Sequence, residues 1–267
     1  MPKRFLGKNA LITGASKGIG YELAKVFARE GWNLILVARS SEKLKEFAAK
    51  LSSEHGVAVH LIVKDLGEPQ GAEELFRECD AKSLRVDALV NNAGVGSFGN
   101  FSETDLLWES KLLDLNISSL TKLTKFFLKP MIARGGGFIL NVASTAAFQP
   151  GPLMAVYYAS KAYVLSFSEA IADELAGSKV SVTALCPGAT KTGFQDAARM
   201  QPSKLFKKHA MAAADVAEQG YEAMIQGKRI VIPGVKNWVM ATLVKFVPRR
   251  IVMKLVRKIQ EADKASV

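Results

Sequence analysis

Short apolar runs alternate with longer amphipathic stretches through residues 9–186, and this alternation limits the possible folds more than any other feature. The apolar runs are uninterrupted, which predicts strands that are buried on both faces of a sheet. Strands separated by helices favour right-handed crossovers, so we expect an α/β fold with a doubly wound parallel sheet of about seven strands and helices on both faces. The expected strands are 9–13, 33–38, 57–63, 87–90, 138–142 and 180–186, and the expected helices are 19–30, 42–54, 71–81, 103–117, 120–133 and 157–176.

A glycine-rich segment at 13–20 joins the first expected strand to the first expected helix. Glycine can adopt the backbone of a tight turn and lets a phosphate approach the main chain closely. The helix N-terminus that follows offers free N–H groups and the positive end of the helix dipole. The segment therefore predicts a Rossmann-type dinucleotide site with contacts from Gly14, Ser16, Lys17, Gly18, Ile19 and Gly20. The alternative is a glycine-rich turn without a ligand.

Arg39 stands at the end of the second expected strand, where proteins that bind NAD usually carry an acidic residue. An acid would repel a 2′-phosphate, whereas an arginine can bond it through two charge-assisted hydrogen bonds. Lys17 adds a second positive charge in the glycine-rich segment, and residues 37–41 contain no acid. We therefore expect NADP(H) as the cofactor. The alternative is that Arg39 is a solvated loop charge.

Tyr157 and Lys161 are spaced four residues apart at the start of an expected helix, so their side chains share one helix face. A phenol has a pKa of about 10, and a nearby ammonium lowers that pKa. A phenol tuned in this way can donate a proton during reduction and accept one during oxidation. Tyr158 lies about 100° further round the helix and is not expected to do this chemistry.

Taken together, these motifs resemble the short-chain dehydrogenase/reductase family over nearly the whole chain. Further matches follow in order: Asp65-Leu66 after the third strand, Asn91-Asn92-Ala93-Gly94 after the fourth, Asn116, Ser144, and Pro187-Gly188-Ala189-Thr190 after the sixth. The resemblance implies cofactor contacts from Asp65, Leu66, Asn92, Ala93, Gly94, Tyr157, Lys161, Pro187, Gly188 and Thr190. It is nearest to the branch that reduces ketoacyl, steroid and other lipophilic carbonyls.

The resemblance also implies a catalytic tetrad of Asn116, Ser144, Tyr157 and Lys161. Ser144 would polarise the substrate oxygen, and Tyr157 would exchange a proton with it while hydride passes between the nicotinamide and carbon. Lys161 would lower the pKa of Tyr157 and hold the nicotinamide ribose. Asn116 would hold a water that links Lys161 to solvent. The implied function is an NADP-dependent oxidoreductase that acts on a carbonyl or alcohol.

The substrate is poorly encoded in the sequence. We expect a lid at 189–214 within a catalytic domain at 1–234, and an apolar pocket that could equally be ordinary packing. Its candidate residues are Phe148, Pro150, Met154, Phe194, Met200, Leu205, Phe206 and Met211. Two other functions remain: a redox-sensing or regulatory protein that holds NADP without turnover, and a nucleotide-sugar epimerase or dehydratase. The intact tetrad argues against the first, and the glycine spacing and chain length argue against the second.

Most of the net charge of +11 lies in the C-terminal part of the chain. Residues 235–259 hold seven Lys/Arg and no Asp/Glu, interleaved with aliphatic residues, and predict two helical segments in a basic amphipathic extension at 235–267. This extension either contacts an anionic membrane or packs on the domain or a second subunit. The aliphatic interleaving argues against nucleic acid. We expect a homodimer or homotetramer through the long helices at 103–133 and 157–176.

The cysteines and histidines predict neither disulfides nor a metal site. The chain has two cysteines and three histidines, and none has metal-ligand spacing. Isolated cysteines suit a reducing compartment, and no signal-peptide pattern or long apolar span is present, so we expect a cytoplasmic protein.

Overall fold

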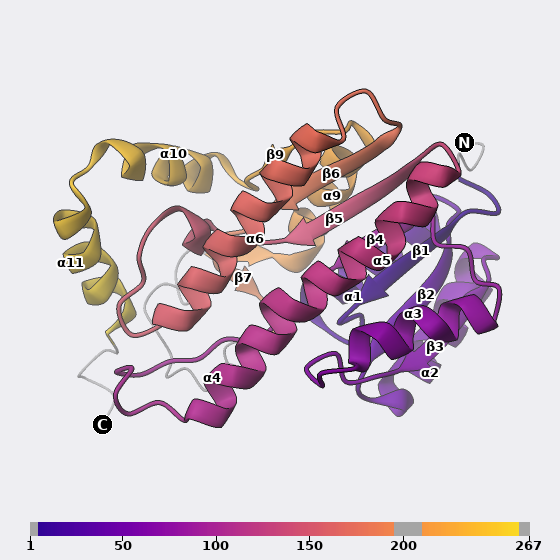
Figure 1. Cartoon of the computed structure of the whole chain (residues 1–267), viewed down its shortest axis with the longest axis horizontal. Helices are drawn as coiled ribbons and strands as arrows, with labels where there is room; N and C mark the ends of the chain where they lie inside the picture. Colours follow the sequence, from indigo (N-terminus) through magenta and orange to yellow (C-terminus); the bar gives the residue numbers. More distant parts are fainter. Residues whose placement is uncertain (1–4, 195–209, 262–267) are drawn as a thin grey trace.

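A computed structural model describes residues 5–194 and 210–261 and confirms the doubly wound α/β fold. In these residues, seven strands form one parallel sheet in the order β3-β2-β1-β4-β5-β6-β9 (Figure 1). The order in which successive strands join the sheet reverses between β1 and β4. Open α/β sheets bind ligands at such a switch point. The strands are β1 Asn9–Thr13, β2 Asn33–Ala38, β3 Val59–Val63, β4 Ala88–Asn91, β5 Gly137–Val142, β6 Val180–Leu185 and β9 Ile230–Val231.

Two apolar layers cover the sheet because successive strand residues point to opposite faces. Ala10 and Ile12 of β1 pack with α1, α2 and α9, whereas Leu11 packs with α3, α5 and α6. Large buried side chains fill these layers, such as Phe27 on the first face and Phe127 on the second. The helices are α1 Gly18–Arg29, α2 Ser41–His55, α3 Gly71–Ala81, α4 Leu106–Leu113, α5 Leu120–Ala133, α6 Ala155–Glu174 and α9 Ala213–Ile225.

The two helices predicted at 103–117 and 120–133 are one continuous helical run, so the predicted break between them was wrong. The run begins at Leu106, where the side chain of Asp105 accepts a hydrogen bond from the N–H of Leu107. A π-helical turn at Asp114–Ser119 joins α4 to α5 and contains Asn116. A π turn inserts one extra residue into the helix and is often found at functional sites. It turns Asn116 inward without ending the helix.

The prediction that every strand is buried on both faces was wrong for β3. This strand lies at the edge of the sheet, and Val63 is 50% exposed. The central strands fit the prediction because β1 and β4 have neighbours on both sides. Other short elements were not predicted: a second sheet pairs β7 Thr190–Lys191 with β8 Met211–Ala212, and β9 completes the main sheet.

Two helices follow the sheet, as predicted for the C-terminal extension. They are α10 Val235–Leu243 and α11 Arg249–Gln260, and they lie at the opposite end of the molecule from α2 and α3 (Figure 1, yellow). Val252 and Val256 of α11 pack with Ala146, Met154 and Tyr158. The extension therefore packs on the catalytic fold with part of its apolar surface. Within the described residues, no helix has the length and apolar character needed to span a membrane.

Candidate active site

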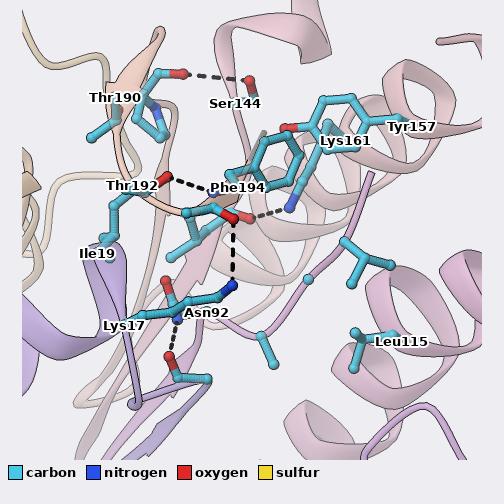
Figure 2. A pocket seen from close by; sticks show the side chains of 18 of the residues that line it. Lys17, Ile19, Asn92, Leu115, Ser144, Tyr157, Lys161, Thr190, Thr192 and Phe194 are labelled. Atoms are coloured by element: carbon cyan, nitrogen blue, oxygen red, sulfur yellow. Dashed lines mark hydrogen bonds between the residues drawn. The ribbon is translucent and has the colours of Figure 1, made fainter. Parts of the chain in front are cut away.

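A cavity of about 280 Å³ opens at the carboxyl ends of the parallel strands, beside the switch point between β1 and β4. Segments from the whole length of the fold line it, from the glycine-rich turn after β1 to the end of α11. Every predicted cofactor residue except Gly20 lines this cavity, together with Ser144. Figure 2 shows Ser144, Tyr157 and Lys161 on one side and Lys17, Ile19 and Asn92 on another. The topology thus gathers motifs that are far apart in the sequence.

The glycine-rich turn forms a cradle that a side chain would fill. Gly14 has a φ of +67°, and a Cβ there would lie 2.8 Å from the amide nitrogen of Asn92. A Cβ on Gly20 would collide with that amide and with the carbonyl of Gly14, so Gly20 acts by close packing behind the cavity. Asn92 in turn donates to the carbonyl of Thr13 at 2.8 Å, tying β4 to β1. This open cradle at the N-terminus of α1 fits a dinucleotide pyrophosphate.

Ser144, Tyr157 and Lys161 come together beyond the end of β5. Ser144 follows β5 and hydrogen-bonds with Tyr157, while its hydroxyl lies 3.4 Å from the carbonyl of Pro187. Lys161 lies one helical turn after Tyr157, with its ammonium 5.9 Å from the centre of the phenol ring. That ammonium donates to the carbonyl of Val142 at 2.8 Å. The predicted helix register therefore places the phenol, hydroxyl and ammonium at one cavity wall.

Burial controls the protonation of this group. It raises the pKa of Tyr157 above its ordinary value, and the hydrogen bond with Ser144 only partly offsets this. Burial also lowers the pKa of Lys161 to about 8. Both shifts favour the neutral form, because charge is poorly solvated away from water. Without cofactor, the phenol is therefore protonated, and the expected lowering of its pKa by Lys161 does not offset the effect of burial.

Asn116 reaches this region from the π turn but does not line the cavity. Its side-chain amide donates to the carbonyl of Val95 at 2.9 Å and to the hydroxyl of Ser160 at 3.1 Å. Its carbonyl oxygen accepts from the N–H of Val95 at 3.0 Å. Both amide hydrogens are thus engaged, and the side chain clamps the strand end after β4 against α6.

Arg39 lines the far end of the cavity, where its side chain is 64% exposed and lies 4.0 Å from Asp65. Burial alone would raise the pKa of the Asp65 carboxyl, but the N–H of Gly67 and the ammonium of Lys111 outweigh it and hold that pKa below its ordinary value. Lys17 points elsewhere, since its ammonium lies 3.3 Å from the carbonyl of Gly193. Arg39 is therefore the better placed of the two predicted cations to meet a phosphate at this end.

Sequence reasoning missed Thr192 and Gly193, which also line the cavity. Thr192 lies so close to the glycine-rich turn that a Cβ on Gly18 would be 3.0 Å from its side chain. Its position shortly after Thr190 was the available signal. Of the predicted pocket residues, Met154 and Phe194 line the cavity, but Phe148, Pro150 and Met211 do not. Met200, Leu205 and Phe206 lie outside the described residues.

The second missed feature is a polar pair in the cavity wall. The side-chain amide of Gln260, at the end of α11, donates to the hydroxyl of Tyr158 at 2.8 Å. Both residues line the cavity and are largely buried. Nothing in the sequence indicated that a residue of the C-terminal extension would reach the catalytic helix. The extension therefore completes the cavity.

Comparison with known proteins agrees with this geometry. The sequence model described as short chain dehydrogenase matches residues 8–203. The chain belongs to this family. A short-chain dehydrogenase from Sphingobium yanoikuyae in complex with NADPH is 30% identical, with a TM-score of 0.80 over 97% of this chain and 99% of that one. A member from Burkholderia phymatum in complex with NAD is 26% identical, with a TM-score of 0.81 over 100% of both chains.

A curated relative is the very-long-chain 3-oxoacyl-CoA reductase of Anas platyrhynchos. It is 35% identical to this chain over 187 residues, which is 68% of this chain and 59% of the relative. This short-chain dehydrogenase thus spans about three fifths of that relative's length. The family is settled by these matches, and it confirms the resemblance drawn from the motifs.

Proposed function

We propose that this member of the short-chain dehydrogenase family is an NADP(H)-dependent oxidoreductase that interconverts a lipophilic carbonyl and its alcohol. The observation that carries the proposal is the meeting of Ser144, Tyr157 and Lys161 in the cavity that also contains the glycine cradle. A nicotinamide dinucleotide would supply or accept the hydride. Gly14, Gly18 and Ile19 would hold its phosphates, and Asn92–Gly94 and Pro187–Thr190 would line the rest of its path.

Tyr157 would exchange the proton at the substrate oxygen. Its burial keeps the phenol protonated, which suits the direction of reduction. Ser144 would hydrogen-bond the same oxygen and polarise the carbonyl. Lys161, held by Val142 on the same helix face as Tyr157, would stabilise the phenolate as the proton leaves. Asn116 would keep the strand end after β4 in place. Both hydrogens of its side-chain amide already donate to protein groups, so a bound water would have to contact another atom of Asn116.

The preference for NADP(H) rests on Arg39. Its exposed guanidinium lines the cavity where the ribose of the adenosine would lie, and it can bond a 2′-phosphate in a bidentate manner. Asp65 faces Arg39 across 4.0 Å, so the phosphate would compete with this carboxylate. Two observations limit that competition: Asp65 already accepts from Gly67, and it pairs with Lys111 at 3.2 Å.

The lipophilic substrate is supported by the apolar part of the cavity wall beside Tyr157. Met154 and Phe194 line it, and the ring of Phe194 lies 5.3 Å from that of Tyr157. Apolar walls with few polar groups are typical of sites for apolar ligands. The acyl-CoA reductase among the relatives points the same way. A long-chain ketone, aldehyde or ketoacyl thioester is the class that fits.

Assembly into a dimer or tetramer through α4, α5 and α6 is part of the proposal. Leu113, Ile132 and Tyr163 on these helices are 43%, 47% and 37% exposed. Light scattering coupled to size-exclusion chromatography would give the mass. A monomer at micromolar concentration would remove this part of the proposal and leave the chemistry untouched.

The proposal is tested with a panel of aliphatic and bulky ketones, ketoacyl thioesters and alcohols, each offered with both nicotinamide cofactors. Loss of absorbance at the reduced nicotinamide band is the readout. We expect turnover of at least one lipophilic carbonyl with NADPH. Tight NADPH binding without turnover of any member would instead favour a redox-sensing or regulatory protein.

A further inference from the structure

The surface of α10 and α11 exposes an unusual amount of apolar area. Among the described residues, eighteen large hydrophobic side chains are exposed, and ten of them lie in residues 235–259. They include Trp238, Leu243 and Phe246, which are 55%, 57% and 80% exposed. Scattered exposed apolar residues are normal, but a concentration of this kind marks an interaction surface.

Helix α11 has an exposed apolar stripe as well as a buried one. Val252, Val256 and Gln260 recur every four residues and face the protein. One residue earlier in each turn, Ile251, Leu255 and Ile259 form a second stripe that is 49%, 54% and 37% exposed. Consecutive residues are separated by about 100° around a helix, so the two stripes lie side by side. Packing on the domain thus accounts for only half of the apolar face of α11.

Basic residues border the exposed stripe on its other side. Arg250, Lys254 and Lys258 recur at the same four-residue spacing, one position before the exposed stripe in each turn. Residues 235–259 contain seven Lys/Arg and no acid, and within the described part of the chain none of the seven forms an ion pair with a carboxylate. Lys245 lies over the ring of Phe148, with its ammonium 5.7 Å from the ring centre. The other six cations have long, flexible side chains that can reach an anionic surface beside the apolar stripe.

We propose that α10 and α11 form a docking surface for an anionic lipid membrane, which the protein contacts from one side. An apolar helix face bordered by Lys/Arg lies in the plane of a lipid interface, with the apolar side chains among the acyl chains and the cations at the phosphates. Charge selects this occupant over a second copy of the chain. An isologous contact would bring seven unpaired cations of each copy against seven of the other.

The docking surface is joined to the cavity through one helix. The buried stripe of α11 ends at Gln260, which lines the cavity and bonds Tyr158. Contact with lipid along the neighbouring stripe places the cavity wall next to the source of a lipophilic substrate. Docking itself requires neither cofactor nor turnover, so it stands or falls independently of the proposed reaction.

The test is flotation of the full-length protein with vesicles of phosphatidylglycerol and phosphatidylcholine in equal parts, and with vesicles of phosphatidylcholine alone. We expect binding to the first and little to the second, and weaker binding as salt is raised. Two variants address the surface: Lys254→Gln with Lys258→Gln, and Ile251→Gln with Leu255→Gln. Removing the two charges should weaken binding about 30-fold, since each cation strengthens binding to an anionic surface by about fivefold.

Matched controls remove equivalent groups at sites away from α10 and α11. Lys45→Gln with Lys179→Gln removes two exposed charges that form no ion pair in the described part of the chain, and Leu6→Gln removes an exposed apolar side chain that precedes β1. Neither should change vesicle binding. No binding at low salt, or equal losses in the surface and control variants, would overturn the proposal. A third result would also overturn it: the protein does not bind vesicles, and the double variant Ile251→Gln with Leu255→Gln dissociates an oligomer. That result would make the surface a protein interface.

Discussion

The side-chain amide of Gln260 donates a hydrogen bond to the hydroxyl of Tyr158, which lies 102 positions earlier in the chain. The bond ties the last helix to the helix that carries Tyr157 and Lys161. Val252 and Val256 pack beneath it against Met154. A basic C-terminal extension thereby becomes a wall of the active-site cavity.

Breaking the hydrogen bond between Gln260 and Tyr158 should loosen the contact between α11 and α6 without removing a catalytic side chain. We expect Tyr158→Phe and Gln260→Leu each to lower the free energy of unfolding by about 1 kcal/mol, because each leaves one buried partner without its hydrogen bond. The double variant should lose less than the sum of the two. Urea unfolding of the four proteins measures this coupling. Fully additive losses would mean that the two side chains do not stabilise one another.

Gly14 and Gly56 form a matched pair for testing the phosphate cradle. Their φ values are +67° and +62°, but a Cβ on Gly14 would lie 2.8 Å from Asn92, whereas nothing lies within 4 Å of one on Gly56. Alanine at either position costs about 1–2 kcal/mol of backbone strain. Only Gly14→Ala should also weaken cofactor binding, measured by titration calorimetry with NADPH. Equal NADPH affinity in the two variants would show that the cradle does not hold the phosphates.

Lys161 should make the stability of the cofactor-free protein depend on pH. Burial lowers its pKa from 10.5 to about 8, so between these values the unfolded chain holds a proton that the folded protein has released. Stability due to this residue therefore rises with pH across that window, by about 3 kcal/mol in total. The difference in unfolding free energy between wild type and Lys161→Met, measured from pH 7 to 10, should grow in favour of the wild type. A difference that is constant with pH would contradict the lowered pKa.

Arg39 should determine the choice between the two nicotinamide cofactors. Arg39→Asp removes a donor for the 2′-phosphate and adds a charge that repels it, so the preference should change from NADPH to NADH. Lys17→Gln should change the ratio of the two affinities far less, because its ammonium is directed at Gly193. Fluorescence titration of both cofactors against the three proteins gives the ratios. A wild type that binds both cofactors equally would remove the role assigned to Arg39.

The sequence revealed the elements whose signal is local. The glycine-rich turn after β1 and the spacing of Tyr157 and Lys161 depend on a few neighbouring residues, and the structure places both where the motifs predicted. The edge position of β3 was not predictable in the same way, because exposure depends on strand order rather than on composition.

Features that depend on distant contacts were missed. The sequence around Asn116 looks like ordinary helix and gives no sign of a π turn. The side chain of Asn116 bonds to Val95 and Ser160, and these contacts exist only in the folded chain. Gln260 reads as the polar end of a surface helix, and its contact with Tyr158 exists only in the folded chain. The apolar residues of α11 were predicted to form one stripe. Packing of α11 against the rest of the protein buries half of them and leaves the other half exposed.

The central claim is that Tyr157 exchanges a proton with the substrate oxygen. The direct measurement is single-turnover oxidation of bound NADPH by a carbonyl substrate, compared among wild type, Tyr157→Phe and Tyr158→Phe. We predict that Tyr157→Phe binds NADPH as wild type does but reacts about 10²–10⁴-fold more slowly, as expected for loss of a general acid. Tyr158→Phe should react within a few-fold of wild type. A Tyr157→Phe protein that reacts at nearly the wild-type rate, or equal losses in the two variants, would contradict the account.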